Sequence, residues 1–415
     1  MLLRCGVNIK KNACDHAILQ GPINMEVKKN LQLSSAAQFV ILIGLVSLFS
    51  DMVYEGSRSV VGPLFETLGA TGAIVGFVAG FGEFAGNVFR IFSGYFVDRT
   101  KQYWLITFIG YACLLAIPLL AFAHTWEIAA VLLIIERVGK AIRTPARDAM
   151  LSYATQKMGR GFGFGIHQLF DQIGGMLGPV IMMLVLLGHQ RYATGFAILF
   201  FPAIITLIIL SIGKALYTDP QNLEVNTPVL SSTAIPRVFW IYLIDACFMA
   251  LGYADFPLIA FHFEKIGLIS PIWIPVFYII ALGMSALSAL FFGWLYDRAG
   301  LISLISAIPL FAFFAPCVFF DGFTLALIGM ILWGIGMGAQ KSLLKAVVGD
   351  MISKNKRGTA FGIFNTGYGI AWFAGSWLMG ILYDISIHDV IIFSMIAEFA
   401  AIPFVIIVHR YAARK

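Results

Sequence analysis

Charge is scarce in this sequence. Only 12% of its 415 residues are Asp, Glu, Lys or Arg, whereas 60% are hydrophobic and 14% are aromatic. A soluble domain with this composition would have more apolar surface than it could bury. The composition therefore excludes an ordinary soluble protein and predicts a chain that crosses a lipid bilayer several times.

Motifs for enzyme chemistry are also missing. The chain has no G-x4-G-K-[ST] phosphate-binding loop, no Cys and His cluster with metal-ligand spacing, and no Ser-centred nucleophile motif. Its five cysteines show no pairing pattern, and Cys113, Cys247 and Cys317 stand alone within apolar stretches. We therefore expect no enzyme activity, no metal or other cofactor, and an ion gradient as the energy source.

Long apolar segments account for most of the chain. A helix that crosses the bilayer needs ~20 apolar residues, and breaks at polar, Gly and Pro clusters divide the sequence into twelve such segments. The sequence thus predicts an all-α membrane protein. The predicted spans are residues 36–60, 72–97, 104–123, 127–150, 162–188, 193–213, 237–262, 273–296, 301–320, 323–350, 359–383 and 389–408.

Lys and Arg are unevenly distributed between the predicted loops. If both termini are cytoplasmic, the inside segments hold 18 of these residues and the outside loops hold two, Arg191 and Lys265. This bias is the positive-inside pattern, so we expect both termini in the cytoplasm, and the inner or plasma membrane as the location if the chain is bacterial. The same pattern explains the formal charge of +6 without a nucleic-acid partner.

The chain is predicted to be a doubled unit. "RGFGFG" at 160–165 recurs as "RGTAFG" at 357–362, a shift of 197 residues. Parallel repeats of this kind are a transporter architecture. The motif G-x3-D-R also occurs twice, as Gly94, Asp98 and Arg99 and as Gly293, Asp297 and Arg298.

These repeats divide the chain into two halves with a polar connection. The expected units are a tail at 1–35, a six-helix bundle at 36–213, a linker at 214–236, a second six-helix bundle at 237–410 and a tail at 411–415. Met25 leaves two explanations of the first residues open: a start codon placed too early, or a cytoplasmic tail.

Together these features resemble the major facilitator superfamily, over about residues 36–410. The resemblance implies two pseudo-symmetric six-helix bundles, a monomer, and a small-molecule substrate bound in a cavity lined by spans 1, 4, 7 and 10. The loop motif departs from the family pattern at Gln102, where a basic residue is usual.

The fifth span is similar to the antiporter motif of exporters in the same superfamily. The residues that carry the similarity are Gly165, Gly174, Gly178 and Pro179, but Met182 and Met183 replace the final glycine pair. The resemblance favours efflux, while close helix packing by small residues is an equal alternative.

Several predicted spans carry charges, although a charge at the bilayer centre costs at least ~2.5 kcal/mol. Asp51, Glu55 and Arg58 are spaced four and three residues apart and so share one helix face. Such faces should meet a wet cavity or one another, so each residue has a structural ion pair as its alternative role. The residues assigned to proton coupling in the central cavity are Asp51, Glu55, Arg58, Glu83, Arg90, Glu136, Arg137, Asp171 and Asp245.

Basic residues recur at the cytoplasmic ends of spans 4 and 10. Arg143 and Arg147 are matched by Lys341 and Lys345, at a shift of 198 residues. By the resemblance these four face the cavity near its inner mouth, where they would attract an anionic substrate or form a gate with nearby acids. The residues assigned to substrate binding or to this gate are Lys140, Arg143, Arg147, Lys341, Lys345 and Trp333.

The leading hypothesis is a proton-coupled secondary transporter of a small organic solute, with efflux favoured. Its partners would be the substrate, protons and the lipid bilayer. An uptake symporter for an organic anion, amino acid or metal-chelate nutrient is the alternative. A transporter-like sensor without net flux is a third possibility.

Overall fold

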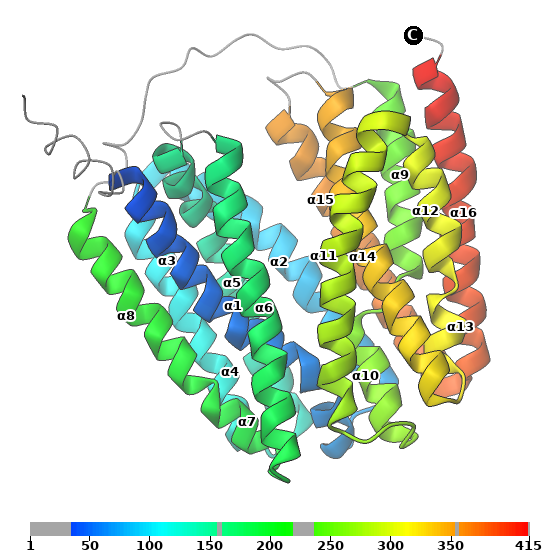
Figure 1. Ribbon diagram of the computed structural model, residues 1–415, viewed down its shortest axis with the longest axis horizontal. Coiled ribbons are helices and arrows are strands. Elements are labelled where there is room, and N and C mark those ends of the chain that lie inside the picture. Colours follow the sequence, from blue (N-terminus) through cyan, green and yellow to red (C-terminus); the bar gives the residue numbers. More distant parts are fainter. Residues whose placement is uncertain (1–34, 156–159, 219–235, 353–356, 414–415) are drawn as a thin grey trace, which may run out of the picture.

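Two helical bundles stand side by side in the structure, a computed structural model that describes residues 35–155, 160–218, 236–352 and 357–413 (Figure 1). The first bundle contains α1 (Ser35–Thr67), α2 (Gly72–Thr100), α3 (Tyr103–Ala112) continued by η1 (Cys113–Leu115), α4 (Ala116–Leu119) and η2 (Leu120–Phe122), α5 (Trp126–Thr155), α6 (Arg160–Leu187), and α7 (Tyr192–Ile198) continued by α8 (Phe200–Leu216). The second contains α9 (Arg237–Gly252) followed by α10 (Phe256–Lys265), α11 (Trp273–Ala299), α12 (Ile302–Ala312) with α13 (Phe314–Phe319), α14 (Phe323–Met351), α15 (Arg357–Ile385) and α16 (Ile387–Ala413).

The described helices therefore form twelve membrane-length units, six in each half, and this confirms the predicted architecture. Ten of the units are apolar and long enough to cross a membrane by composition alone. The other two are α5, which carries a stripe of charges, and α15, which is interrupted by Gly, Asn and Trp. Most of the first tail and of the linker lies outside the described residues, as do 414–415.

The seventh unit is broken at its centre. α9 ends at Gly252, and Asp255 begins α10 as its N-cap by accepting a 2.9 Å hydrogen bond from the Phe256 backbone N–H. Pro257 follows in the first helical turn, where its missing N–H costs nothing. The break places the Asp255 carboxylate between the two halves.

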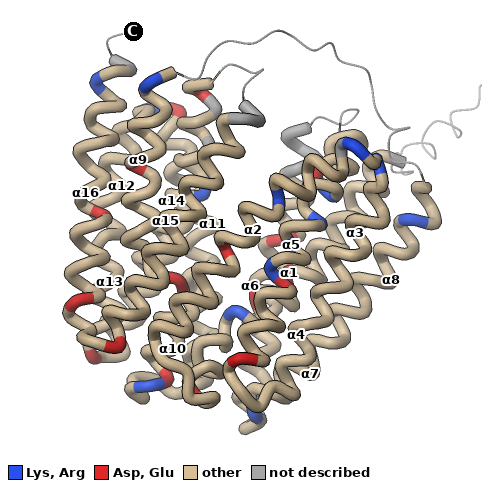
Figure 2. Tube along the Cα trace, turned by 180° about the vertical axis from the view of Figure 1, so that it is seen from behind, with Lys and Arg blue, Asp and Glu red and all other residues tan. Residues whose placement is uncertain are grey.

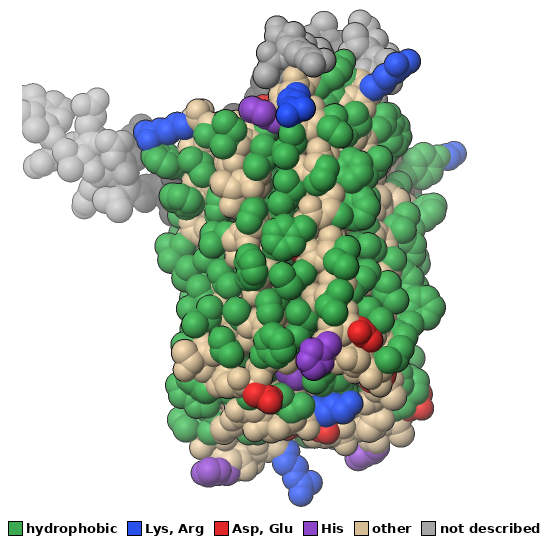
Figure 3. All heavy atoms as spheres, turned by 90° about the vertical axis from the view of Figure 1, so that its right-hand side faces the viewer, with side chains coloured by type: hydrophobic (Ala, Val, Ile, Leu, Met, Phe, Trp, Pro, Cys, Tyr) green, Lys and Arg blue, Asp and Glu red, His purple; other side chains and the backbone are tan. Residues whose placement is uncertain are grey.

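The chain enters α1 and leaves α16 at the same end of the molecule, which we call the terminal end, and the opposite end is the far end (Figure 1). Figure 3 shows one face of the molecule on which hydrophobic side chains cover the middle. Charged and His side chains gather near the two ends of this face. Charged positions also occur inside the molecule, where α1, α2 and α5 approach one another (Figure 2).

The two halves are in close contact at the far end. A side chain at Gly76 of α2 would overlap the Ser376 carbonyl oxygen of α15, and one at Gly62 of α1 would overlap the carbonyl oxygen of Pro257. Toward the terminal end such contacts stop. Glycines there at which an added Cβ would meet no atom of the described residues within 4 Å include Gly86, Gly165, Gly293 and Gly362.

Candidate functional site

A cavity lies between the halves, above their closed far end. It has two adjoining parts of about 220 Å³ each, which share Arg58, Glu83, Asn87 and Lys341. One part is further lined by Tyr54, Glu55, Gly82, Gly86, Arg90, Arg137, Lys140 and Ala141. The other is further lined by Tyr253, Met337, Gln340, Leu344, Phe364, Asn365, Tyr368 and Trp372.

The charged face of α1 joins the two halves. Arg58 Nη2 lies 2.5 Å from Asp255 Oδ1 at the N-cap of α10, and both side chains are almost fully buried. The Tyr278 hydroxyl of α11 donates a 2.5 Å hydrogen bond to Glu55 Oε2. The charges in this apolar helix are therefore tolerated because they are paired across the interface or lie on the cavity wall.

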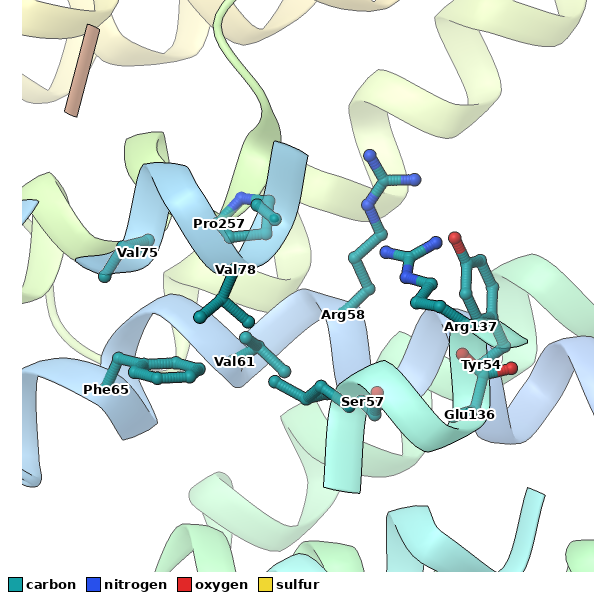
Figure 4. Close-up of a pocket in the computed structure, with 12 residues that line it drawn as sticks. Tyr54, Ser57, Arg58, Val61, Phe65, Val75, Val78, Glu136, Arg137 and Pro257 are labelled. Carbon is teal, nitrogen blue, oxygen red and sulfur yellow. The ribbon is translucent and has the colours of Figure 1, made fainter. Parts of the chain in front are cut away.

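A second ion pair crosses the first half. Arg137 Nη1 of α5 lies 2.7 Å from Glu83 Oε1 of α2, and the Tyr54 hydroxyl donates a longer bond to the same oxygen. The Lys140 ammonium lies 3.4 Å from the centre of the Tyr54 ring. Figure 4 shows Arg58 and Arg137 beside a small pocket of about 30 Å³ that both residues line. The guanidinium groups of Arg58 and Arg137, both from the first half, thus lie beside the same pocket.

A polar network extends from this cavity toward the terminal end. His167 of α6 bonds Ser47 of α1 through Nε2 at 2.7 Å, and its Nδ1 lies 3.4 Å from Asp171 Oδ2. Arg147 donates to Ser47 at 3.3 Å and pairs with Asp148 at 2.9 Å. Asp51 is the next charge inward.

Asp51 completes this group on α1. Its carboxyl group interacts electrostatically with Asp171, Lys140 and Glu55. The structure thus brings together acids from α1 and α6 with a base from α5.

Some predicted site residues lie elsewhere. Arg143 is fully buried, donates to the Gly110 carbonyl oxygen at 3.3 Å and lies 3.6 Å from Glu136. Asp245 and Trp333 are fully buried and line neither part of the cavity. Arg143 does not face the inner mouth as the resemblance implies, because the pair that it forms with Glu136 points toward α3. The side chains of Lys345 and Asp98 lie outside the described residues.

Sequence reasoning misses Tyr278 and Gln340 as site residues. A single Tyr or Gln in an apolar helix has the same pattern as a packing residue, so no signal marks either one. Asp255 has a recognisable signal, since an acid directly before Phe256 and Pro257 is typical of a helix start.

The repeated loop motif has a matched local contact in both halves. Arg99 Nη1 donates to the Tyr95 hydroxyl at 3.1 Å, and the Arg298 guanidinium lies 4.0 Å from the Trp294 ring centre. Each arginine therefore contacts the aromatic residue one turn earlier on its own helix. Gly94 and Gly293 lie near these contacts at the terminal end.

The glycines of the exporter-like motif lie where α6 meets α1. A side chain at Gly174 would overlap the Leu48 carbonyl oxygen, and one at Gly178 would overlap that of Met52. Pro179 follows within α6, and Gly165 has open space around it. These glycines allow close packing inside the first half.

We expect Gly178→Leu to lower the stability of the protein. Overpacking a close contact costs about 1–3 kcal/mol, so the thermal unfolding temperature of the purified protein should fall. Gly165→Leu, on the same helix, is the control and should leave that temperature unchanged. Equal unfolding temperatures for the two variants would contradict this account of the motif.

Comparisons with known proteins agree with the fold. The family model described as Major Facilitator Superfamily matches residues 42–376. An uncharacterized protein of Mycobacterium tuberculosis is 38% identical over 378 residues, which cover 89% of this chain and 92% of the relative. An uncharacterized transporter of the major facilitator type from Methanocaldococcus jannaschii is 28% identical over 360 residues, or 84% of this chain and 89% of that protein. The crystal structure of the nucleoside transporter NupG superposes with a TM-score of 0.70 at 15% identity, over 90% of this chain and 98% of that one.

Proposed function

Because the chain belongs to the major facilitator superfamily, we propose that its two halves rock around the central cavity and couple the movement of a small organic solute to that of protons. Membership of the family makes the protein a multi-pass membrane transporter and not an enzyme. The coupling ion, the substrate and the direction of transport are our proposal.

The bond between Glu55 and Tyr278 is the observation that supports proton coupling. Glu55 lines the cavity, and its carboxylate accepts the 2.5 Å bond from the Tyr278 hydroxyl in the other half. A titratable group is thus part of the contact between the halves. Protonation of Glu55 would remove the charge that strengthens this bond, so proton binding and separation of the halves would be linked.

The polar network gives protons a route to Glu55. Asp51 lies one helical turn before Glu55, and the His167 and Asp171 pair lies beside it on α6. The Asp148 side chain is 45% exposed and is joined to this network through Arg147. We propose that protons enter or leave from the terminal end along the carboxylates and His167, while Arg147, which keeps its proton, positions Asp148 and Ser47.

The terminal end is the cytoplasmic end in this proposal. The excess of Lys and Arg in the segments at that end supports the assignment. Since the glycine contacts between the halves lie at the far end, the described conformation would then be open toward the cytoplasm.

Export is the direction that we propose, and the exporter-like motif of α6 supports it. Uptake of an organic anion by symport is the second candidate, because basic residues are abundant on the cavity wall. Both directions use the same carboxylates.

The test is transport by the purified protein in liposomes that contain a pH-sensitive dye. Pools of organic acids, nucleosides and short peptides would be screened with and without an imposed proton gradient. We expect substrate-dependent proton movement, which Asp51→Asn and Glu55→Gln abolish. The direction of proton movement relative to the solute separates export by antiport from uptake by symport.

Glu66→Gln is the matched control, because Glu66 lies on the same helix near the far end and lines neither part of the cavity. This variant should transport as the unmodified protein does. Solute flux that responds neither to the proton gradient nor to Asp51→Asn and Glu55→Gln would overturn proton coupling.

A further inference from the structure

The two walls of the central cavity differ in chemistry. The wall from the first half carries charged side chains, including Arg58, Glu83 and Arg90. The wall from the second half is largely aromatic and neutral, with Tyr253, Phe364, Tyr368 and Trp372. A solute that contacts both walls needs a polar end and a flat apolar body.

Hydrogen bonding indicates what the polar end must be. Among the described residues, three buried donors on the cavity wall have no acceptor: Gln340 Nε2, Arg58 Nε and Arg90 Nε. Gln340 is 4% exposed and Arg58 is 9% exposed. An unsatisfied buried donor costs about 1–3 kcal/mol, so these groups favour a ligand that brings acceptor atoms.

Three acceptor atoms of the cavity lining already have donors, and the buried side-chain atoms without a partner among the described lining residues are all donors. Glu83 Oε1 accepts from Arg137 and from Tyr54. Glu55 Oε2 accepts from Tyr278, and Gln340 Oε1 accepts a 2.7 Å bond from the Tyr368 hydroxyl. A ligand rich in donors would find fewer unmet partners than one rich in acceptors.

Charge favours the same chemistry. The residues that line the cavity include five bases and two acids, namely Arg58, Arg90, Arg137, Lys140 and Lys341 against Glu55 and Glu83. Asp255 behind Arg58, Asp51 and Glu136 near Lys140, and Asp148 near Arg90 offset part of this excess, while the lining itself holds more bases than acids. A lining with more bases than acids favours a ligand that carries negative charge.

The second wall offers a continuous aromatic surface. Phe364, Tyr368 and Trp372 follow one another at intervals of four residues on α15, so they share one helix face. Their ring centres are 6.3 Å and 5.8 Å apart, and Tyr253 lies 5.7 Å from Trp372. Neighbouring rings at these distances can hold a flat ligand by offset stacking or edge contacts.

We propose that the transported solute is an organic anion with a flat aromatic body. Its acidic group accepts hydrogen bonds from Gln340 and Arg58, and its ring lies against Tyr368 and Trp372. This inference rests on the proposed function, since it takes the cavity between the halves as the transport site.

Binding to the purified full chain in lipid nanodiscs tests the proposal. The probes are 2-naphthoate and benzoate as aromatic anions, cyclohexanecarboxylate as a nonaromatic anion, benzamide as a neutral ring and benzylammonium as a cationic ring. We expect the aromatic anions to bind most tightly and benzylammonium least. Failure of both aromatic anions to bind, or equal binding of benzylammonium, overturns the proposal.

Variants of Gln340 test the acidic-group contact. Gln340→Leu should weaken 2-naphthoate binding by about 10- to 100-fold, because a hydrogen bond to a charged group is lost. Gln340→Glu keeps an acceptor for Tyr368 but places a negative charge against the ligand, so it should weaken binding further. Unchanged affinity in both variants would contradict the contact.

Variants of α15 test the ring contact. Trp372→Leu should weaken 2-naphthoate binding by about 3- to 10-fold, whereas Trp372→Phe should largely restore it. Trp377→Leu is the matched control, because Trp377 is 43% exposed and lines neither part of the cavity. A loss with Trp377→Leu equal to that with Trp372→Leu would overturn the assignment of the ring to this wall.

These results are separable from the test of proton coupling. Aromatic anions that bind as expected but move no protons would refute the proposed coupling and leave the ligand class intact. Proton-coupled transport of a cation would refute the ligand class and leave the coupling intact.

Discussion

Arg58→Gln is expected to destabilise the protein by about 3–5 kcal/mol and to abolish transport, because it leaves Asp255 buried without its charged partner. The Asp255 side chain is 1% exposed and lies 2.5 Å from Arg58. It also caps α10 and accepts a long bond from Trp372 Nε1, so it cannot move to water without opening the break between α9 and α10. Asp255→Asn should be similarly harmful, since it leaves Arg58 unpaired.

The double variant Arg58→Gln with Asp255→Asn separates the cost of an unpaired buried charge from the role of the ion pair in transport. Replacing both members of a buried ion pair removes the uncompensated charge, so the double variant should recover most of the lost thermal stability. It should not recover transport if the pair must break and re-form as the halves rock.

Arg137→Gln serves as the comparison for this prediction. The side chain of its partner Glu83 is 32% exposed, so water can solvate the Glu83 carboxylate when the guanidinium is removed. The thermal unfolding temperature of the detergent-solubilised protein should therefore fall less than in Arg58→Gln. An unfolding temperature for Arg58→Gln equal to that of the unmodified protein would show that the Arg58 and Asp255 pair does not hold the halves together.

The sequence predicts the spans and the repeat because both depend on local composition and on order along the chain. It is less informative about which neighbour each charged face meets. The sequence assigns Arg137, Lys140 and Arg143 of α5 alike to the cavity, but Arg137 and Lys140 line it whereas Arg143 does not. One residue of a helix turns by about 100°, so a shift of one position is enough to direct Arg143 toward Gly110 instead of the cavity.

The spacing of residues along the sequence cannot predict the contacts between the two halves. Glu55 is predictable as a cavity residue from its spacing to Asp51, but its partner Tyr278 is 223 residues away in a segment of apolar sequence. The glycines of α2 are similar. Gly72, Gly76 and Gly80 recur every four residues, and only the structure reveals that they meet α15 of the other half.

Gly76→Leu is expected to shift the protein away from the described conformation and to stop transport. A side chain at Gly76 would overlap the Ser376 carbonyl oxygen and would lie 3.1 Å from Gly380 Cα. Neither is the end of a flexible side chain, so α2 and α15 must separate. A cost of about 1–3 kcal/mol to the state closed at the far end shifts its equilibrium by about 5- to 150-fold.

The contact that Gly76→Leu disrupts is reinforced one turn away. The Asp384 carboxylate of α15 accepts 2.8 Å hydrogen bonds from the backbone N–H groups of Gly72 and Ala73, at the beginning of α2. A negative charge at a helix N-terminus is stabilising, so Asp384 of the other half stabilises the beginning of α2. Separation of α2 from α15 at Gly76 would strain these bonds as well. The closed far end would then lose the stabilisation from the glycine contact and from the Asp384 hydrogen bonds together.

Spin labels at Arg191 and Ser270, exposed positions at the far end in opposite halves, allow the shift to be measured. Gly76→Leu should lengthen the distance between the labels, because opening of the far end moves the halves apart there. Gly86→Leu is the matched control on the same helix, since a Cβ added at Gly86 would meet no atom of the described residues within 4 Å. The same distance distribution in both variants would mean that the close approach of α2 and α15 does not control the far end. A longer distance in Gly76→Leu alone would show that this glycine contact holds the far end closed.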